Sequence, residues 1–215
     1  MKYTFVGDIH GKDYAVEAAL DRDGMKIFVG DFMDSFDRTP KQHRRCLELV
    51  TRAIEIGEAR AIYGNHELNY LMPRHRCSGW SQAGADLMRE FQDKIEELFD
   101  PHIILAPDFL VTHAGLTKRL WDGNGMDLDS LGTTLSMWWH DDTSPVHYIG
   151  VYRGGNRAYG GTFWCDWNQE FEPVPGLRQV CGHSAGGSRG MIRQNGNSYN
   201  VDCLDLSNRF LTLEI

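Results

Sequence analysis

Five segments of this sequence place acidic, imidazole or amide side chains directly after short apolar runs. They read FVGDIHG, IFVGDFMD, AIYGNHE, LVTHAG and QVCGHS, and each has a glycine close to its polar residue. The polar residues are Asp8, His10, Asp31, Asp34, Asn65, His66, Glu67, His113 and His183. One such segment is weak evidence, because an Asp or Asn in a turn bonds nearby backbone N–H groups. Five on one chain favour a shared site over five unrelated turns.

These side-chain types indicate a site for divalent metal ions. Carboxylate, imidazole and amide groups without a thiolate suit Mn²⁺, Fe²⁺ or Zn²⁺. Two such ions about 3.5–4 Å apart can hold a phosphoryl group, lower the pKa of a bridging water and stabilise both the attacking and the departing oxygen. Two cations at that distance repel each other and need a bridging carboxylate. Asp31 is the natural candidate, because it follows a strand and a glycine in the middle of the set.

The elements that must position these residues follow an early alternation of strand and helix patterns. We predict strands at residues 3–6, 25–29, 61–63, 102–105 and 109–112, and helices at 14–20, 80–99 and 129–139, with another helix from a Thr39-Pro40 start to about residue 56. Later strands are predicted at 178–181, 191–193, 199–204 and 210–213, with an Asn195-Gly196 hairpin turn. This order indicates a layered α/β domain with a mixed sheet, whose strand ends would gather the polar residues in one crevice.

Composition limits the class of protein. The chain has 215 residues, 41% of them hydrophobic and 24% charged, which is typical of a soluble globular protein, and we predict one domain over residues 1–215. No apolar run approaches the roughly 20 residues that span a bilayer, and the first residues enter a strand pattern at once, so we expect a cytoplasmic protein with no membrane partner. The net charge of −8 argues against strong nucleic-acid binding, and bound cations would neutralise part of it. Five cysteines without a CxxC pair argue against disulfides and a zinc knuckle.

In order and spacing, GDIHG, GDFMD, GNHE and the single histidines of VTHAG and GHS resemble the metallophosphoesterase signature. The resemblance covers residues 7–184 and is closest to the phosphoprotein-phosphatase branch, which includes small bacterial and phage enzymes and the diadenosine-tetraphosphate hydrolases. It implies a calcineurin-like fold of two mixed β-sheets sandwiched by helices, with a dinuclear site at the sheet ends.

The resemblance also implies a role for each residue of the set. The first metal would be held by Asp8 and His10, the bridge would be Asp31, and the second metal would be completed by Asn65, His113 and His183. His66 would be the general acid that protonates the leaving-group oxygen, and Asp34 would orient and charge it. The two ions would be Mn²⁺, with Fe or Zn as alternatives.

One position departs from the family pattern. The family reads GDxxDRG, whose arginine clamps the phosphate, whereas this chain has Ser35 in place of that arginine. Arg38 could swing back to fill the role. A second family arginine would be Arg153 or Arg157, of which the position before GGTFW favours Arg157.

The remaining candidates have simpler interpretations. His43, His75, His102, His140 and His147 are expected to be surface or core residues, with His140 the one that could border the cleft. Glu67 is expected to be an acid at a helix N-terminus. The tryptophans Trp138, Trp139, Trp164 and Trp167 are expected to pack rather than stack on a base. Residues 74–80 (RHRCSGW) are expected to form either a solvated connection or a segment that binds an anionic substrate tail. Residues 140–176 are expected to form a long functional loop.

The function expected from the sequence is a dinuclear-metal-dependent phosphoester hydrolase that uses a metal-bound hydroxide. A phosphomonoesterase of the Ser/Thr protein phosphatase type is the first choice, with a phosphoprotein as substrate. A nucleotide or polynucleotide phosphoesterase, including a dinucleoside-polyphosphate hydrolase, is the alternative that Ser35 favours. A non-catalytic metal- or phosphate-binding module is the second alternative. The sequence leaves the oligomeric state open.

Overall fold

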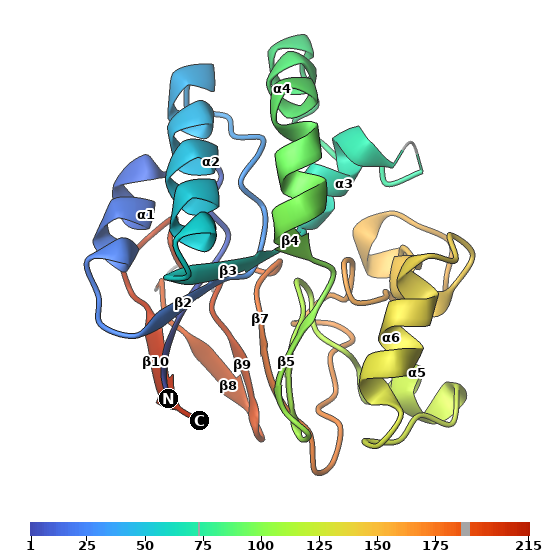
Figure 1. Ribbon diagram of the computed structural model, residues 1–215. Helices are drawn as coiled ribbons and strands as arrows, with labels where there is room; N and C mark the ends of the chain where they lie inside the picture. Colours follow the sequence, from blue (N-terminus) through green and yellow to red (C-terminus); the bar gives the residue numbers. More distant parts are fainter. Residues whose placement is uncertain (73, 186–189) are drawn as a thin grey trace.

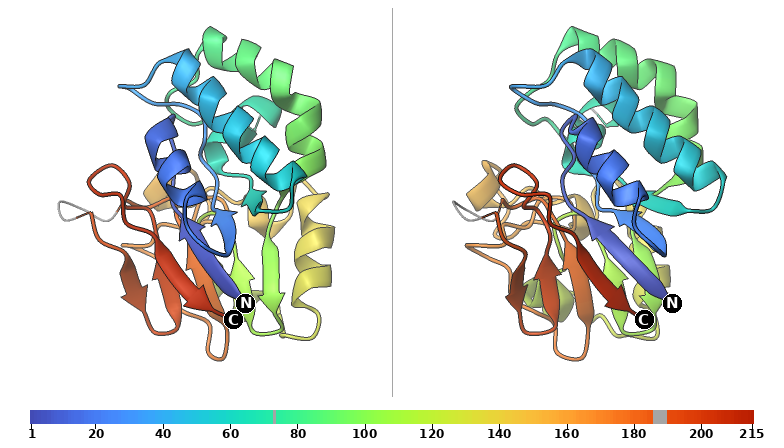
Figure 2. Two further views of the ribbon diagram at one scale, coloured as in Figure 1. Left: turned by 60° about the vertical axis from the view of Figure 1, so that its left-hand side comes forward. Right: turned by 90° about the vertical axis from the view of Figure 1, so that its left-hand side faces the viewer.

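Two β-sheets pack face to face in the computed structural model, which describes residues 1–72, 74–185 and 190–215. The first sheet has the strand order β10-β1-β2-β3-β4. Its strands are β1 (Lys2–Val6), β2 (Met25–Phe28), β3 (Ala59–Ile62), β4 (Phe99–Asp100) and β10 (Leu211–Glu214). Strands β1 to β4 are parallel, and β10 pairs antiparallel with β1, so the two chain ends lie side by side (Figure 2).

The second sheet has the order β5-β6-β7-β9-β8 and is also mixed. Its strands are β5 (Ile103–Ala106), β6 (Phe109–Val111), β7 (Arg178–Cys181), β8 (Arg193–Asn195) and β9 (Ser198–Asn200). Strands β6, β7 and β9 are parallel, and β5 and β8 are antiparallel edges. The sequence prediction of a layered α/β fold with mixed sheets is therefore confirmed.

Helices cover the outer faces of both sheets (Figure 1). They are α1 (Asp13–Leu20), α2 (Pro40–Glu55), α3 (Asn65–Leu71), α4 (Gln82–Leu98), α5 (Lys118–Gly123) and α6 (Leu131–Trp139), with short 3₁₀ turns η1 (Pro145–His147) and η2 (Val151–Arg153). Helices α1, α2 and α4 pack on the first sheet, and α5 and α6 pack on the second. No helix in the described part of the chain has the length and apolar character needed to cross a membrane.

The alternation of side chains along each strand builds the layers. In β1 and β2, Phe5 and Ile27 point between the sheets, whereas Val6 and Phe28 point toward the helices. The ring of Phe5 stacks on Phe109 of the second sheet, with centroids 6.0 Å apart. Burying one such side chain stabilises the fold by about 1.5–3 kcal/mol. This packing fixes the two sheets relative to each other, and hence the loops at their ends.

Helix α2 begins where the sequence predicts. The backbone N–H of Gln42 donates to Thr39 Oγ1, and the Gln42 side chain accepts from the backbone N–H of Thr39, with Pro40 in the first turn. This capping box satisfies N–H groups that the first turn of a helix leaves without partners. The helix start predicted at Thr39-Pro40 is therefore confirmed.

Some sequence predictions about local structure are wrong. In the hairpin of β8 and β9, Asn195 pairs with Ser198, so the turn is Gly196-Asn197 rather than Asn195-Gly196. The predicted strand 199–204 ends at Asn200, because the chain then leaves the sheet. The sequence analysis gave no residue range for helices α3 and α5. Both are short, and hydrophobic periodicity is a weak signal over so few residues.

Residues 160–167, in the middle of the long loop of residues 140–176, are buried. Phe163 is 1% exposed and Cys165 is fully buried, and the four tryptophans of the predicted packing group are all buried or half-buried. The expectation that these tryptophans pack is confirmed.

The histidines outside the motifs lie where the sequence predicts, in the core or on the surface. His75 and His147 are buried and form a chain of hydrogen bonds. Trp164 Nε1 donates to His75 Nδ1 at 2.8 Å, His75 Nε2 lies 3.0 Å from His147 Nδ1, and His147 Nε2 lies 3.1 Å from the carbonyl oxygen of Trp139. Because the indole can only donate, each ring donates onward through Nε2, and both rings are neutral. His43 is buried, His102 is half-buried, and His140 is exposed at the end of α6.

Candidate metal centre

The loops that follow five strands bring the polar residues of the sequence motifs together. Asp8 and His10 follow β1, Asp31 and Asp34 follow β2, Asn65 and His66 follow β3, His113 follows β6, and His183 follows β7. Parallel strands end at the same edge of a sheet, and the two sheets meet at this edge. A cavity of about 540 Å³ lies there, with Asp8, His10, Asp31, Asn65 and His183 among its lining residues.

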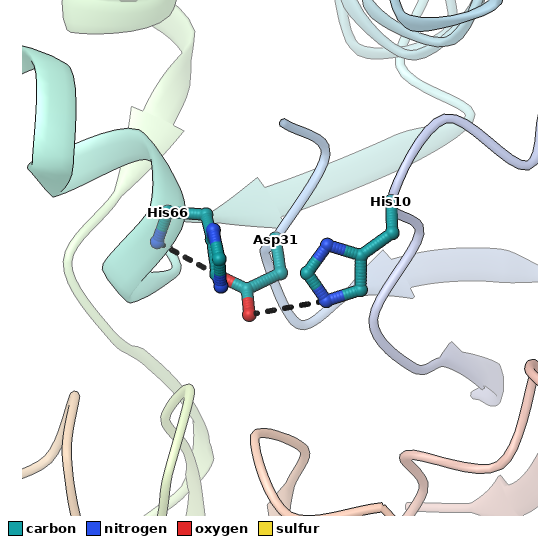
Figure 3. Close-up of side chains that lie close together, drawn as sticks. All are labelled: His10, Asp31 and His66. Atoms are coloured by element: carbon teal, nitrogen blue, oxygen red, sulfur yellow. Dashed lines mark hydrogen bonds and ion pairs between the residues drawn. The ribbon is translucent and has the colours of Figure 1, made fainter. Parts of the chain in front are cut away.

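Asp31 lies at the centre of the group. Its Oδ2 atom is 3.6 Å from His10 Nε2 and 3.4 Å from His113 Nε2. Its Oδ1 atom accepts a hydrogen bond of 3.0 Å from the backbone N–H of His66. Figure 3 shows the carboxylate of Asp31 between the His10 and His66 side chains. Burial alone would raise the pKa of Asp31, but the neighbouring charges of His113 and His66 hold it well below its usual range. Asp31 is thus an ionised carboxylate facing imidazole nitrogens.

Backbone carbonyls set which nitrogen of each ring faces the cavity. His10 Nδ1 lies 2.9 Å from the carbonyl oxygen of Met33, and His113 Nδ1 lies 2.8 Å from that of Val29. A carbonyl only accepts, so each Nδ1 carries a proton and each ring turns Nε2 toward Asp31. Nε2 is thus the nitrogen of each ring that could bind a cation shared with Asp31.

A second group of donors lies on the other side of Asp31. Asn65 Oδ1 is 2.9 Å from His113 Nε2 and 2.8 Å from His183 Nδ1, and these two nitrogens are 3.2 Å apart. Burial lowers the pKa of His113, but Asp31 and Asp8 raise it to about 9. The position therefore favours positive charge, and a divalent cation would supply that charge in place of the proton. The residues present fit a metal ion here.

Backbone strain is concentrated at the same residues. In the described part of the chain, the non-glycine residues with positive φ are His10 (45°), Asp31 (54°), Asp34 (58°) and His183 (67°). This left-handed conformation is uncommon for residues with a Cβ atom and clusters at functional sites. Each of these four residues belongs to the predicted set.

The glycines of two motifs make room for the carboxylates. A Cβ atom on Gly64 would lie 2.1 Å from Asp31 Oδ1, and one on Gly182 would lie 2.1 Å from Asp8 Oδ1. Only glycine therefore allows these carboxylates to approach the neighbouring loops. This close approach explains why a glycine precedes the polar residue in GNHE and GHS.

Glu67 has a larger role than the helix-terminal acid that the sequence predicts. It is fully buried, and its two carboxylate oxygens accept hydrogen bonds from the backbone N–H groups of Asp31, Phe32, Met33 and Gly64 at 2.8–3.0 Å. Burial and the nearby charge of Asp31 raise the pKa of Glu67 to about 7. Glu67 thereby fixes the loop that carries Asp31, although the two residues are far apart in the sequence.

His66 and Asp34 form a hydrogen-bonded pair beside the cavity. His66 Nδ1 is 2.9 Å from Asp34 Oδ2, and the hydroxyl of Tyr70 donates to Asp34 Oδ1. Burial lowers the pKa of His66, but Asp31 and Asp34 raise it well above its usual value. Sequence reasoning missed Tyr70, although it lies four residues after His66 and so shares a face of α3 with it.

The predicted arginines lie in different places. Arg153 lines the metal cavity, where its Nε is 2.9 Å from Asp166 Oδ2 and its Nη2 donates to Ser184 Oγ at 2.5 Å. Arg38 lies over the ring of Tyr14 and pairs with Asp37, and Arg157 lies over the ring of Tyr148 beside a separate cavity. The structure brings Arg153 to the metal cavity and places Arg38 and Arg157 outside it.

Residues 74–80 divide between the two roles proposed for them. Arg76 and Cys77 line the metal cavity, whereas Arg74 pairs with Asp142 at the surface.

Two carboxylates in the cavity were missed. Asp202 and Asp205 line it, and Asp205 pairs with Lys12 at 2.7 Å. Burial and Asp205 raise the pKa of Asp202 to about 7, and burial and Asp202 raise the pKa of Asp8 well above its usual range. The sequence analysis missed Asp202 because it assigned residues 199–204 to a strand.

Comparisons with known proteins give the sequence family and the fold. A sequence model described as calcineurin-like phosphoesterase matches residues 1–186. The chain is similar in structure to a cold-active protein-tyrosine phosphatase of a psychrophilic Shewanella species, with 17% identity, a TM-score of 0.65, and coverage of 99% of this chain and 75% of that one. A protein serine/threonine phosphatase from Saccharomyces cerevisiae matches with 18% identity, a TM-score of 0.49, and coverage of 94% of this chain and 67% of that one. No curated protein matches the chain. At 17% identity, the likeness to the Shewanella phosphatase shows the fold alone.

Proposed function

The chain belongs to the calcineurin-like phosphoesterase family and is a metal-dependent phosphoesterase, and on that premise we propose that it is a dinuclear phosphomonoesterase of the Ser/Thr protein phosphatase type. The observation that carries the proposal is the position of Asp31. Its Oδ2 atom lies within 3.6 Å of His10 Nε2 and 3.4 Å of His113 Nε2, and both rings commit Nδ1 to a backbone carbonyl. One carboxylate oxygen therefore faces the Nε2 atoms of two imidazoles, an arrangement that suits a bridging ligand.

The proposed ligands divide into two sets around this carboxylate. One ion would be held by Asp8 and His10, the other by Asn65, His113 and His183, and both by Asp31. When bound, such ions supply Lewis-acid activation of a phosphoryl group and of water. Mn²⁺ is the proposed metal, and Fe or Zn suits the same ligand types.

His66 is proposed as the acid that protonates the leaving group. Asp34 Oδ2 accepts the Nδ1 proton at 2.9 Å, which holds the ring in place and leaves Nε2 to carry the transferable proton. The negative charges of Asp34 and Asp31 favour the imidazolium form. A positioned acid of this kind typically accelerates such a step about 10²- to 10⁴-fold.

Arg153 is proposed to bind the phosphoryl group. Asp166 and Ser184 hold its guanidinium at the wall of the cavity, so little rotamer entropy remains to be lost on binding. Arg38 and Arg157 remain proposals for contacts with more distant parts of a substrate.

A nucleotide phosphoesterase is the second candidate. Two observations favour it: Ser35 stands in place of the clamping arginine, and the exposed carboxylate of Asp205 at the cavity would repel a dianionic monoester. A non-catalytic binding module is less favoured, because the acid and every proposed ligand are present.

Turnover of two model substrates tests the proposal. Purified protein with added Mn²⁺ is expected to hydrolyse p-nitrophenyl phosphate faster than bis-p-nitrophenyl phosphate, and the Asp31→Asn variant is expected to hydrolyse neither. Preference for the diester would support the nucleotide alternative. Full activity of Asp31→Asn, or no metal-dependent turnover of either ester, would contradict the enzymatic assignment.

Two further proposals concern the whole chain. We propose that residues 1–215 form one domain, because the site combines residues from both sheets. We propose a cytoplasmic location, which the five free cysteines support.

A further inference from the structure

A third group of side chains that could bind a metal ion lies beside His66. It consists of Asp34, His66 and Cys77, whose ligand atoms all lie within 4.8 Å of one another. His66 Nδ1 is 2.9 Å from Asp34 Oδ2 and 3.5 Å from Cys77 Sγ. Asp31, the proposed bridge of the metal centre, takes no part in this group. The group therefore differs from the dinuclear site in its donor atoms, although His66 also lies near His10 and Asp31.

The segment that carries Cys77 is fixed against α3. The backbone N–H of Cys77 donates to Asn69 Oδ1 at 3.2 Å, and the backbone N–H of Ser81 donates to the hydroxyl of Tyr70 at 3.2 Å. Between them, Gly79 has a φ of +93°, and a Cβ atom there would lie 2.8 Å from the Cβ atom of Asp34. The chain thus approaches Asp34 as closely as a glycine permits. These contacts hold Cys77 close to His66 and Asp34.

This group includes a thiol, which the dinuclear centre lacks, and so it favours a softer metal ion. A thiolate, an imidazole and a carboxylate are the usual protein ligands of Zn²⁺, whereas Mn²⁺ and Mg²⁺ prefer oxygen. A tetrahedral zinc ion about 2.0–2.3 Å from each donor holds its donors about 3.3–3.7 Å apart. The separation of His66 Nδ1 and Cys77 Sγ, 3.5 Å, matches this value, and that of His66 Nδ1 and Asp34 Oδ2, 2.9 Å, would need to widen slightly.

Cys77 is also accessible to an incoming ion. Among the five cysteines, all within the described residues, Cys77 is the half-buried one and the other four are buried. It lines the same cavity as His66 and Asn65, and His66 also borders an adjoining cavity of about 430 Å³ with Asp34. An ion could therefore reach the three donors through either opening.

We propose that Asp34, His66 and Cys77 form a third cation site that binds Zn²⁺ and thereby inhibits the enzyme. Binding releases two protons, one from the Cys77 thiol and one from Nδ1 of protonated His66, and it transfers no electrons. The zinc ion then forms bonds to Sγ, Nδ1 and Oδ2, and the hydrogen bond between His66 and Asp34 is lost. The His66 ring keeps only its Nε2 proton.

Inhibition follows from the loss of the hydrogen bond that positions His66. Zinc on Nδ1 would replace the proton that Asp34 Oδ2 accepts at 2.9 Å. His66 would then have neither its second proton nor the partner that orients it, so it could not protonate a leaving group. This consequence depends on the proposed role of His66, but the binding of zinc does not.

Alkylation of Cys77 tests binding without any assay of activity. Protein saturated with Mn²⁺ is treated with iodoacetamide, and modification of the peptide that contains Cys77 is followed by mass spectrometry. Addition of Zn²⁺ is expected to slow this modification at least about 10-fold, and Mg²⁺ at the same concentration is expected to leave it unchanged. Equal rates with and without Zn²⁺ would overturn the proposal.

Cobalt provides a spectroscopic test with matched variants. Co²⁺ bound to a thiolate gives a ligand-to-metal charge-transfer absorption that nitrogen and oxygen ligands do not give. This band is expected in the wild type and in Ser78→Ala, which changes the neighbouring cavity residue, and is expected to be absent in Cys77→Ser. A band that persists in Cys77→Ser, or that is missing from the wild type, would contradict a site built on Cys77.

The inhibitory effect is measured separately. With Mn²⁺ in excess, the Zn²⁺ concentration that halves turnover of p-nitrophenyl phosphate is expected to be at least about 10-fold higher in Cys77→Ser than in the wild type, each relative to its own uninhibited rate. An unchanged concentration would refute the inhibitory role. Absence of any turnover would instead refute the proposed function, and the alkylation and cobalt results would still decide the site.

Discussion

Glu67 Oε2 accepts a hydrogen bond of 2.9 Å from the backbone N–H of Asp31, and Glu67 Oε1 accepts one of 2.8 Å from that of Phe32. A fully buried carboxylate thus fixes the loop that presents the central ligand of the metal site. The loop carries strained backbone at Asp31 and Asp34, and a strained loop needs such support to keep one conformation.

Replacing Glu67 by Gln is expected to loosen this loop. The amide has one acceptor oxygen fewer and turns its own N–H groups toward backbone N–H donors, so the variant should lose about 1–3 kcal/mol of stability. Its affinity for Mn²⁺ should fall about 10- to 100-fold, as for other groups that orient ligands. Urea unfolding and metal titration measure the two effects. Glu58→Gln, a change at an exposed acid, is the control, and normal Mn²⁺ affinity in Glu67→Gln would rule out the positioning role.

Replacing Asp31 by Asn is expected to abolish binding of two ions together. The amide lacks the charge that offsets repulsion between two cations. Turnover should therefore fall by more than about 100-fold, which exceeds the loss caused by removing a residue that only orients a ligand. Metal analysis after gel filtration gives the number of bound ions. Asp37→Asn, at an exposed acid of the same loop, should keep both ions and the activity. Two tightly bound ions in Asp31→Asn would show that the bridge lies elsewhere.

Replacing His66 by Asn is expected to affect poor leaving groups most. Nitrophenolate departs without a proton, whereas a serine alkoxide needs one, so kcat should fall about 10²- to 10⁴-fold for a phosphoserine peptide and less for p-nitrophenyl phosphate. The exposed His140→Asn change provides the control. A uniform loss for both substrates would argue against His66 as the acid.

Arg153 and Arg157 provide a matched pair for the phosphate contact. Because Arg153 lines the metal cavity and Arg157 does not, Arg153→Ala should raise the KM for p-nitrophenyl phosphate about 10- to 100-fold, and Arg157→Ala should leave it nearly unchanged. Steady-state kinetics at saturating Mn²⁺ measure both. A larger rise in KM for Arg157→Ala than for Arg153→Ala would instead support Arg157 as the phosphate-binding arginine, as the sequence alone favoured.

The buried pair of His75 and His147 predicts acid sensitivity. Burial lowers the pKa of His75 to about 3 and also lowers the pKa of His147, whereas both titrate near 6.5 in an unfolded chain. Below pH 6.5 the unfolded chain therefore binds more protons than the folded one, and the free energy of unfolding falls as the pH falls. For His75 the slope should approach about 1.4 kcal/mol per pH unit between pH 6.5 and pH 3.

Urea unfolding of metal-free protein at pH 7.5, 6 and 5 measures this slope. The His75→Gln variant should be less stable at neutral pH but should show a shallower slope, because Gln does not titrate. Parallel pH profiles for the variant and the wild type would show that His75 does not cause the acid sensitivity.

The proposed metal ligands could be found in the sequence because each stands in a local pattern. An apolar run followed by a glycine and an acid, amide or histidine marks a strand that ends at a loop, and such ends meet at one edge of parallel strands. Asp8, Asp31 and Asn65 were predicted on this basis, and they line one cavity. The capping signal at Thr39 is likewise local, since its two partners lie three residues apart.

The tertiary structure alone decided which residues surround those ligands. Whether Arg153 or Arg157 reaches the cavity depends on how the loop of residues 140–176 packs, and that loop has no periodic pattern to interpret. Cys77 contacts His66 across a sequence separation of eleven residues, and Asp202 raises the pKa of Asp8 from the opposite end of the chain. Local propensity and spacing act over a few residues, whereas contacts between distant loops depend on the packing of the whole core, which a pattern of residue types does not encode by itself.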